Sequence, residues 1–183
     1  MSNNSGETIN SFWSFVDLYD ILYIENLYNL TLPVWAKDIL AEENDSLCGF
    51  AWAVDAYTTE LGRLISGPLI DVIVGHFENI TNNVSDTPKF LMLSAHDMTI
   101  ATLLTTLQIY DYKWPQYSST VLFELRKGPQ NNYVNIFYKN VEEAVNKTLP
   151  NCDFNCGLED FGKLVEPVRI NLQQRDEECN ITE

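Results

Sequence analysis

The adjacent residues His96 and Asp97 are the strongest candidates for chemistry in this sequence. A histidine can bind a phosphate group while a neighbouring carboxyl group donates a proton, a combination that suits phosphoryl transfer. The same pair also fits a structural role, with Asp97 as a plain helix N-cap and His96 as a packed loop residue. Residue type and spacing alone leave both interpretations open.

The residues around this pair predict a strand, a tight loop and a helix. Phe90–Leu93 is a short, unbroken apolar run, typical of a strand buried on both faces of a parallel sheet. Beyond the pair, apolar residues recur at the spacing of one helix face, at Ile100, Leu103, Leu104 and Leu107. The pair is therefore expected beyond the carboxyl end of a strand and at a helix start, where open α/β sheets bind ligands and backbone N–H groups favour anions.

Other patterns outline the rest of the chain. Residues 1–11 are polar, and we expect them to be disordered. Apolar residues at helical spacing predict a helix that ends at Gly67-Pro68, with Pro68 in the first turn of a second helix. Alternating residues predict two strands, 120–126 and 133–138, joined as an antiparallel hairpin.

Composition and charge exclude several classes of partner. The chain has 183 residues with 45% hydrophobic content, a net charge of −15 and a pI near 4.3. Such an acidic protein is a poor partner for nucleic acid and for anionic membrane surfaces. We expect no transmembrane span, and the first seven residues lack the basic and apolar regions of a signal peptide.

Acceptor sites for N-glycosylation are frequent nevertheless. Asn-x-Ser/Thr occurs at Asn29, Asn44, Asn79, Asn83 and Asn146, and also at Asn3 and Asn180. This density favours a protein that passes through the secretory pathway.

The string Leu93-Ser94-Ala95-His96-Asp97, followed by Thr99 and an apolar helix, resembles the second active-site motif of the histidine acid phosphatases. The resemblance is strongest to the branch with prostatic, lysosomal and insect venom acid phosphatases. It extends from about Phe12 to Cys179, through segments that include Leu18-Tyr19-Asp20, Asn29-Leu30-Thr31-Leu32-Pro33, Tyr117-Ser118-Ser119 and Leu149-Pro150-Asn151-Cys152.

The resemblance implies an α/β fold. Residues 12–183 would form the C-terminal portion of a doubly wound, three-layer domain, with helical cap elements and with the N-terminal strands missing. It also implies a secreted or lysosomal location and a phosphate monoester as the substrate of the full-length protein.

The resemblance further assigns roles to single residues. Asp97 would protonate the leaving alcohol, His96 would bind the phosphoryl group, and Trp13 would lie near the rim of the substrate cleft, with a buried tryptophan as the alternative. Cys152 and Cys156 resemble a short disulfide of the family. The pairing of Cys48 and Cys179 stays open. No cofactor is expected, and a zinc site is excluded because the Cys-x3-Cys pair has no second ligand pair near it.

One feature of the family is absent. Its members carry an Arg-His-Gly-x-Arg-x-Pro motif, in which the histidine attacks phosphorus and the arginines hold the phosphate, and no Arg-His-Gly occurs here. The only histidines are His76 and His96. We therefore expect the isolated chain to be catalytically incomplete. The alternatives are a non-catalytic secreted glycoprotein or venom component that keeps half of the fold, and a chain that forms a homodimer or binds a separately made N-terminal half.

Overall fold

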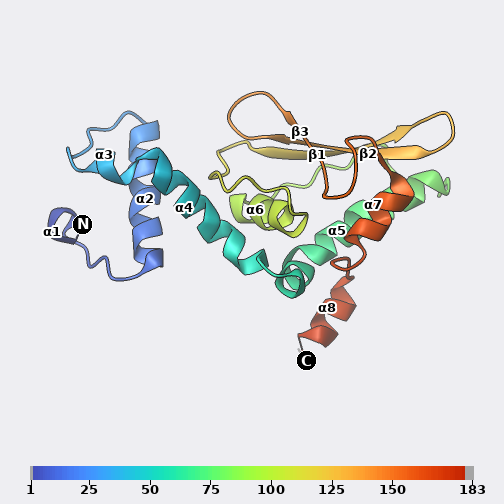
Figure 1. The fold of residues 1–183 in the computed structure, drawn as a ribbon, viewed down its shortest axis with the longest axis horizontal. Helices are drawn as coiled ribbons and strands as arrows, with labels where there is room; N and C mark the ends of the chain where they lie inside the picture. The colour runs from blue at the N-terminus through green and yellow to red at the C-terminus, as the bar shows by residue number, and fades with distance from the viewer. Residues whose placement is uncertain (1, 180–183) are drawn as a thin grey trace. The chain divides into compact units, whose positions relative to one another are not determined.

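The computed structural model describes residues 2–179, which fall into two compact units. The first unit comprises the residues up to Trp52 together with Tyr112–Trp114, and the second comprises Ala53–Asp111 and the residues from Pro115 onward. Along the chain, a series of helices comes first, the strands of an antiparallel sheet follow, and further helices come last (Figure 1). The mixed α/β class predicted from the sequence is confirmed.

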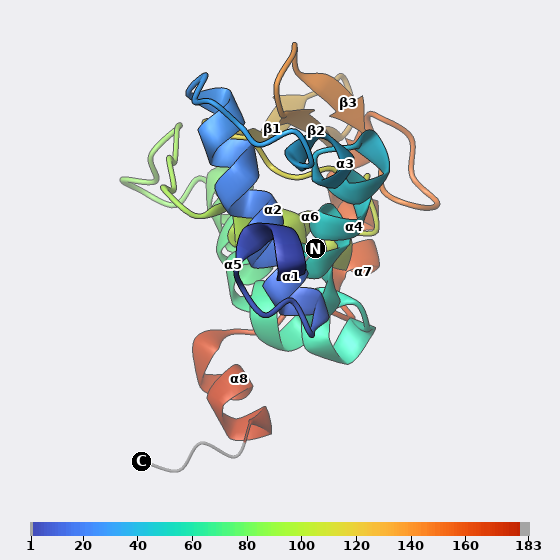
Figure 2. The same cartoon turned by 90° about the vertical axis from the view of Figure 1, so that its left-hand side faces the viewer.

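The first unit is built from helices α1 (Ser2–Ser5), α2 (Phe12–Leu27), α3 (Ala36–Ile39) and α4 (Glu42–Ala53) (Figure 2). Ser11 caps α2, because its Oγ accepts a hydrogen bond from the Ser14 N–H at 3.1 Å. The stretch 2–11, which we expected to be disordered, thus contains the single turn α1. A helix of one turn has little stability of its own in water, and disorder of this stretch stays a prediction.

Aromatic packing holds the first unit together. The Trp114 ring lies 5.6 Å from that of Tyr19 and 5.3 Å from that of Trp52, measured between centroids. The Tyr19 hydroxyl donates to Asp45 Oδ1 at 3.1 Å. Burial raises the pKa of the Cys48 thiol in this core to about 12. The buried residues of the cluster are Val16, Leu18, Tyr19, Leu22, Ala36, Ile39, Cys48, Ala51 and Trp114.

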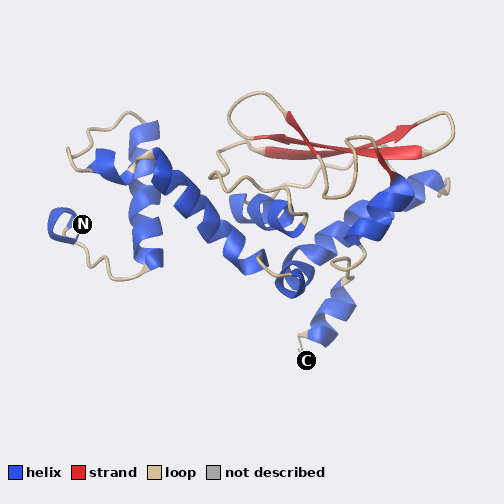
Figure 3. Cartoon of the chain, viewed as in Figure 1, coloured by secondary structure: helices blue, strands red, loops and turns tan. Residues whose placement is uncertain are grey.

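The second unit contains a sheet of four antiparallel strands, with helices on one side of it (Figure 3). Strands β1 (Thr120–Lys127) and β2 (Asn132–Lys139) form the predicted hairpin, with Thr120 opposite Lys139 and Lys127 opposite Asn132. The short strands β3 (Val145–Lys147) and β4 (Cys156–Gly157) pair with β2. The helical elements are η1 (Val54–Ala56), α5 (Thr59–Thr81), α6 (Asp97–Thr106), α7 (Leu158–Val165) and α8 (Leu172–Glu178).

The C-terminal segment is fastened along α5 by arginines. Arg169 Nε donates to Asp71 at 2.7 Å and its guanidinium pairs with Glu78, while Arg63 pairs with Glu178 at 2.9 Å. Gly67 of α5 lies directly beneath this segment, because a Cβ atom at that position would meet the Val168 carbonyl oxygen and the Ile170 side chain. Residues about a hundred positions apart in sequence therefore form one contact.

The predicted helix break at Gly67-Pro68 is wrong. Helix α5 continues through Pro68. It begins well before the proline, with Thr58 as its N-cap, whose Oγ1 accepts the Leu61 N–H at 3.2 Å. Packing explains why the helix continues. Proline removes one backbone hydrogen bond from a helix, but the C-terminal segment packs on α5 at the neighbouring Gly67. Tertiary contact here outweighs the local helix-breaking tendency of proline.

The predicted strand at Phe90–Leu93 is also not formed. None of the described strands pairs with this segment, and its four side chains are exposed, at 72%, 42%, 78% and 51%. A buried parallel strand needs at least one neighbouring strand and a cover on each face. The described residues supply neither, so the segment stays an extended loop.

Two glycines of α5 provide a matched test of the contact with the C-terminal segment. Gly67→Ala should lower the free energy of unfolding by about 1–3 kcal/mol, because the new methyl group overlaps Val168 and Ile170. Gly75→Ala, where nothing lies within 4 Å, should raise it by about 0.5–1 kcal/mol. Urea unfolding of both variants measures this, and equal effects would contradict the packing described.

The pair between Arg63 and Glu178 predicts a pH-dependent attachment of α8. The hydrogen bond from Arg63 lowers the pKa of Glu178, so the stabilisation is present above about pH 4.3, the ordinary value for glutamate, and is lost as pH falls through the lowered pKa. Glu178→Gln should therefore speed amide exchange in α8 at neutral pH and change little at strongly acidic pH. Glu177→Gln on the same helix is the control, and an equal effect of Glu178→Gln at both pH values would refute the prediction.

Candidate functional site

The predicted pair His96 and Asp97 lies at the start of helix α6, as the sequence indicated. His96 is the N-cap with an extended backbone, and its N–H donates to Thr99 Oγ1 at 3.4 Å. Asp97 Oδ1 accepts the Met98 N–H at 2.7 Å. Both side chains are exposed. One carboxyl oxygen of Asp97 therefore helps to begin the helix, while the carboxyl group as a whole remains accessible.

Helix α6 is a firm support for this pair. Ala101, Leu103 and Leu104 bury one of its faces, with 4% or less of each residue exposed. The Thr102 and Thr105 hydroxyls donate to the carbonyl oxygens of the preceding turn, and the helix packs against α5. Groups on a packed helix hold their direction better than groups on a loop.

The cations that a phosphate site requires are engaged elsewhere. The sequence has four arginines, and each is paired with at least one carboxylate: Arg63 with Glu178, Arg126 with Glu124, Arg169 with Asp71 and Glu78, and Arg175 with Asp176. The second histidine, His76, lies on α5 with its ring 6.4 Å from that of Phe77. Among the described residues, no arginine forms an ion pair with Asp97.

Trp13, expected at the rim of a cleft, is 49% exposed, and its ring lies 5.6 Å from that of Phe12. The alternative of a buried tryptophan is thereby excluded. Trp13 belongs to the first unit, whereas His96 and Asp97 belong to the second. Its role in a cleft stays a prediction.

The disulfide between Cys152 and Cys156 is formed. It closes a loop that the buried Asn135 fixes to strand β2, because the Asn135 side-chain amide donates to Phe154 O and to Asn155 Oδ1, each at 3.0 Å. Cys48 and Cys179 are unbonded in the structure, the first buried and the second exposed.

The predicted glycosylation sites differ in their surroundings. Asn29, Asn79, Asn83 and Asn146 are exposed. Asn44 is partly buried, and its side-chain amide donates to the carbonyl oxygens of both Asp38 and Ile39 at 3.0 Å. A glycan on this nitrogen would remove one of the two donors, so Asn44 is the least suitable acceptor of the five. The further site at Asn180 lies outside the described residues.

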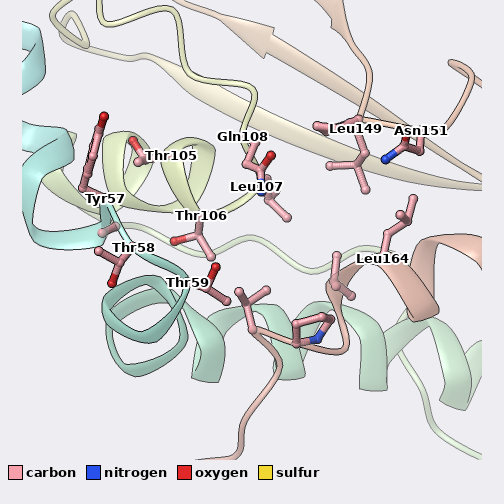
Figure 4. Close-up of a pocket in the computed structure, with 15 residues that line it drawn as sticks. Tyr57, Thr58, Thr59, Thr105, Thr106, Leu107, Gln108, Leu149, Asn151 and Leu164 are labelled. Carbon is pink, nitrogen blue, oxygen red and sulfur yellow. The ribbon is translucent and has the colours of Figure 1, made fainter.

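A cavity at the other end of α6 was not anticipated from the sequence. It has a volume of about 330 Å³ and lies between the end of α6, the start of α5, the loop before the disulfide and the end of α7 (Figure 4). The only signal in the sequence was the repeated threonine pair, at 58–59 and 105–106. The lining residues are Ala56, Tyr57, Thr58, Thr59, Thr105, Thr106, Leu107, Gln108, Leu149, Pro150, Asn151, Leu164, Val165, Pro167 and Val168.

Within residues 2–179, no group of three or more His, Cys, Asp or Glu side chains is arranged to hold a metal ion. No helix in this part is both long enough and apolar enough to cross a membrane.

Comparison with known proteins places the sequence among phosphatases. Residues 11–139 match the family model of the histidine phosphatase superfamily, branch 2. The chain is 35% identical to lysosomal acid phosphatase of Xenopus laevis over 182 residues, 96% of this chain and 41% of that protein. It is 33% identical to human prostatic acid phosphatase, over 92% of this chain and 44% of that protein. It is 30% identical to venom acid phosphatase Acph-1 of Apis mellifera, over 90% of this chain and 43% of that protein. The chain thus spans less than half the length of these relatives.

The exposure of Phe90–Leu93 predicts where a protease cuts the folded chain. Chymotrypsin should cleave after Phe90 or Leu93 among its first sites, because this segment has exposed side chains and no paired strand. Phe77 and Phe161, which are 5% and 1% exposed, are internal controls and should be cut late. Mass spectrometry of the first fragments measures the order, and early cleavage at Phe77 would contradict it.

Proposed function

Because the chain belongs to branch 2 of the histidine phosphatase superfamily, we propose that it is the C-terminal portion of a phosphomonoester hydrolase. The observation that carries this proposal is the His96-Asp97 pair, exposed at the start of a packed helix in a chain whose relatives are acid phosphatases. The helix positions two side chains of suitable chemistry toward solvent, where an ester could reach them.

His96 and Asp97 have separate roles in this proposal. The His96 ring donates a hydrogen bond to an oxygen of the transferring phosphoryl group, where negative charge is concentrated. Asp97 protonates the alcohol oxygen as its bond to phosphorus breaks, so that the product leaves as a neutral alcohol. Since Asp97 Oδ1 accepts the Met98 N–H, Oδ2 is the oxygen that carries the proton.

The chain alone is inactive in this proposal. By resemblance to the family, the attacking nucleophile belongs to the Arg-His-Gly motif, which the sequence lacks. None of the four arginines stands in that motif, and each of them pairs with at least one carboxylate. A net charge of −15 further disfavours an anionic substrate without such a clamp.

A complementing N-terminal half is the partner that we propose. Four consecutive exposed apolar residues, Phe90–Leu93, precede the His96-Asp97 pair directly. In an extended chain their side chains alternate between two faces, so burying them requires a strand beside them and a layer on each side. A polypeptide that supplies the other part of the family fold meets both requirements and brings the missing motif to His96.

A secreted or lysosomal location is part of the same proposal. Relatives of this chain are named as lysosomal, prostatic and venom acid phosphatases. The exposed acceptor sites Asn29, Asn79, Asn83 and Asn146 are compatible with glycosylation in the secretory pathway.

Hydrolysis of p-nitrophenyl phosphate at about pH 5 tests the catalytic proposal. The chain alone should equal the buffer, and activity should appear when it is refolded with the segment of the Xenopus laevis relative that bears the Arg-His-Gly motif. In that complex Asp97→Asn should lower kcat by about 10²–10⁴-fold, because the leaving alcohol loses its proton donor. His96→Ala should lower kcat by about 10²–10³-fold.

His76→Asn is the matched control, because it removes the other histidine, which the proposal gives no catalytic role. Turnover by the chain alone that disappears in Asp97→Asn would refute the need for a complementing half and would require a different nucleophile. Binding of the two halves without any turnover would favour a non-catalytic glycoprotein.

A further inference from the structure

The cavity at the C-terminal end of α6 is separate from the His96-Asp97 pair. The ten residues of α6 place the two sites at opposite ends of the helix, about 15 Å apart along its axis. All fifteen lining residues belong to the second unit, so the cavity is complete within that unit. Its volume of about 330 Å³ lies at the lower end of the range of small-molecule sites, about 300–1,000 Å³.

The lining carries no charged side chain. Its polar groups are the hydroxyls of Tyr57 and four threonines and the side-chain amides of Gln108 and Asn151. These lining side chains offer an ionised ligand no opposite charge. The strongly negative charge of the chain opposes an anion further.

The hydroxyl groups of the two threonines at the end of α6 already donate their protons within the helix, so they can only accept further hydrogen bonds. Thr105 Oγ1 donates its proton to Ala101 O and Thr106 Oγ1 donates to Thr102 O, each at 2.7 Å. Each hydroxyl oxygen retains lone pairs for a further donor. A ligand that reaches them must therefore bring its own O–H or N–H groups, although Thr105 is only 9% exposed and the Thr106 side chain also faces Gly62 of α5.

The start of α5 lies on the same wall, and the carboxylate of Glu60 offsets the partial positive charge of this helix end. Thr58 accepts the Leu61 N–H at 3.2 Å. Hydrogen bonds from its own backbone N–H and from the Thr58 side chain lower the pKa of Glu60. The positive end of this helix thus carries a carboxylate of its own and has little attraction left for a ligand anion.

The opposite wall is mainly apolar, with Asn151 as a polar side chain beside Leu149. Figure 4 shows Tyr57, Thr58, Thr59, Thr105 and Thr106 toward one end of the cavity, with Leu149 and Leu164 toward the other. Val165 and Val168 add to the apolar lining, and Leu149 and Val165 are 6% and 1% exposed. The cavity therefore has one hydroxyl-rich wall and one mainly aliphatic wall.

We propose that this cavity binds a neutral monosaccharide unit. A pyranose ring has hydroxyl groups around its edge that donate hydrogen bonds, and it has patches of C–H groups on its faces that pack against aliphatic side chains. It carries no charge, and it is small enough for a cavity of this volume. This site is independent of the proposed phosphatase role, because it includes neither His96 nor Asp97.

Saturation-transfer NMR on the full chain tests the inference, with methyl α-D-mannopyranoside, N-acetylglucosamine and inorganic phosphate as probes. At least one sugar should bind with a Kd on the order of 1–10 mM, and phosphate should not displace it. Thr59→Val removes an exposed hydroxyl while keeping the side-chain shape, and it should weaken binding by about 2- to 10-fold. Thr59→Trp should fill the cavity and abolish binding.

Thr120→Val, at the exposed start of strand β1, is the matched control and should bind as the unchanged chain does. Circular dichroism establishes that each variant keeps its fold. Absence of binding by both sugars would overturn the inference. It would also fail if Thr59→Trp bound sugar normally, or if phosphate competed for the cavity. Phosphatase activity plays no part in these outcomes, so they are separate from the test of the catalytic role.

Discussion

The contact between helix α5 and the C-terminal segment is the interaction on which the second unit depends. A glycine at position 67 lets the backbone around Val168 approach the helix closely. Arg169 pairs with both Asp71 and Glu78. The Arg63 guanidinium donates a hydrogen bond to the Arg169 carbonyl oxygen at 2.6 Å and also pairs with the Glu178 carboxylate, so another side chain would not easily replace it. Helix α6 packs on the same helix α5, which thereby supports the His96-Asp97 pair.

The arginines of the chain pair with carboxylates in two ways. Arg63 and Arg169 pair with carboxylates that are remote in sequence and so join α5 to the C-terminal segment, whereas Arg126 and Arg175 pair with carboxylates one or two residues away. His96 and Asp97, for which we propose the roles of phosphate ligand and proton donor, lie at the start of a packed helix. Phosphoryl transfer depends mainly on positioning and electrostatic stabilisation, so in this proposal the partner supplies the cations of the missing motif.

Helix α6 connects two different sites. Its start presents an exposed histidine and carboxyl group, and its end contributes two threonines to a neutral cavity. The difference follows from what surrounds each end. Aliphatic residues before the disulfide and at the end of α7 line part of the cavity, whereas the start of the helix follows the exposed segment Phe90–Leu93.

The sequence by itself determined the features that depend on neighbouring residues. The start of α6 at His96-Asp97 and the hairpin of β1 and β2 follow from apolar periodicity and turn residues. Features that depend on distant residues were decided only by tertiary structure. Phe90–Leu93 has the composition of a buried strand but forms none, because none of the described strands pairs with it. Helix α5 passes through Pro68, and the threonine pairs meet in one cavity, because segments remote in sequence pack there. Local patterns specify which conformation a segment prefers, and packing decides which preferences are realised.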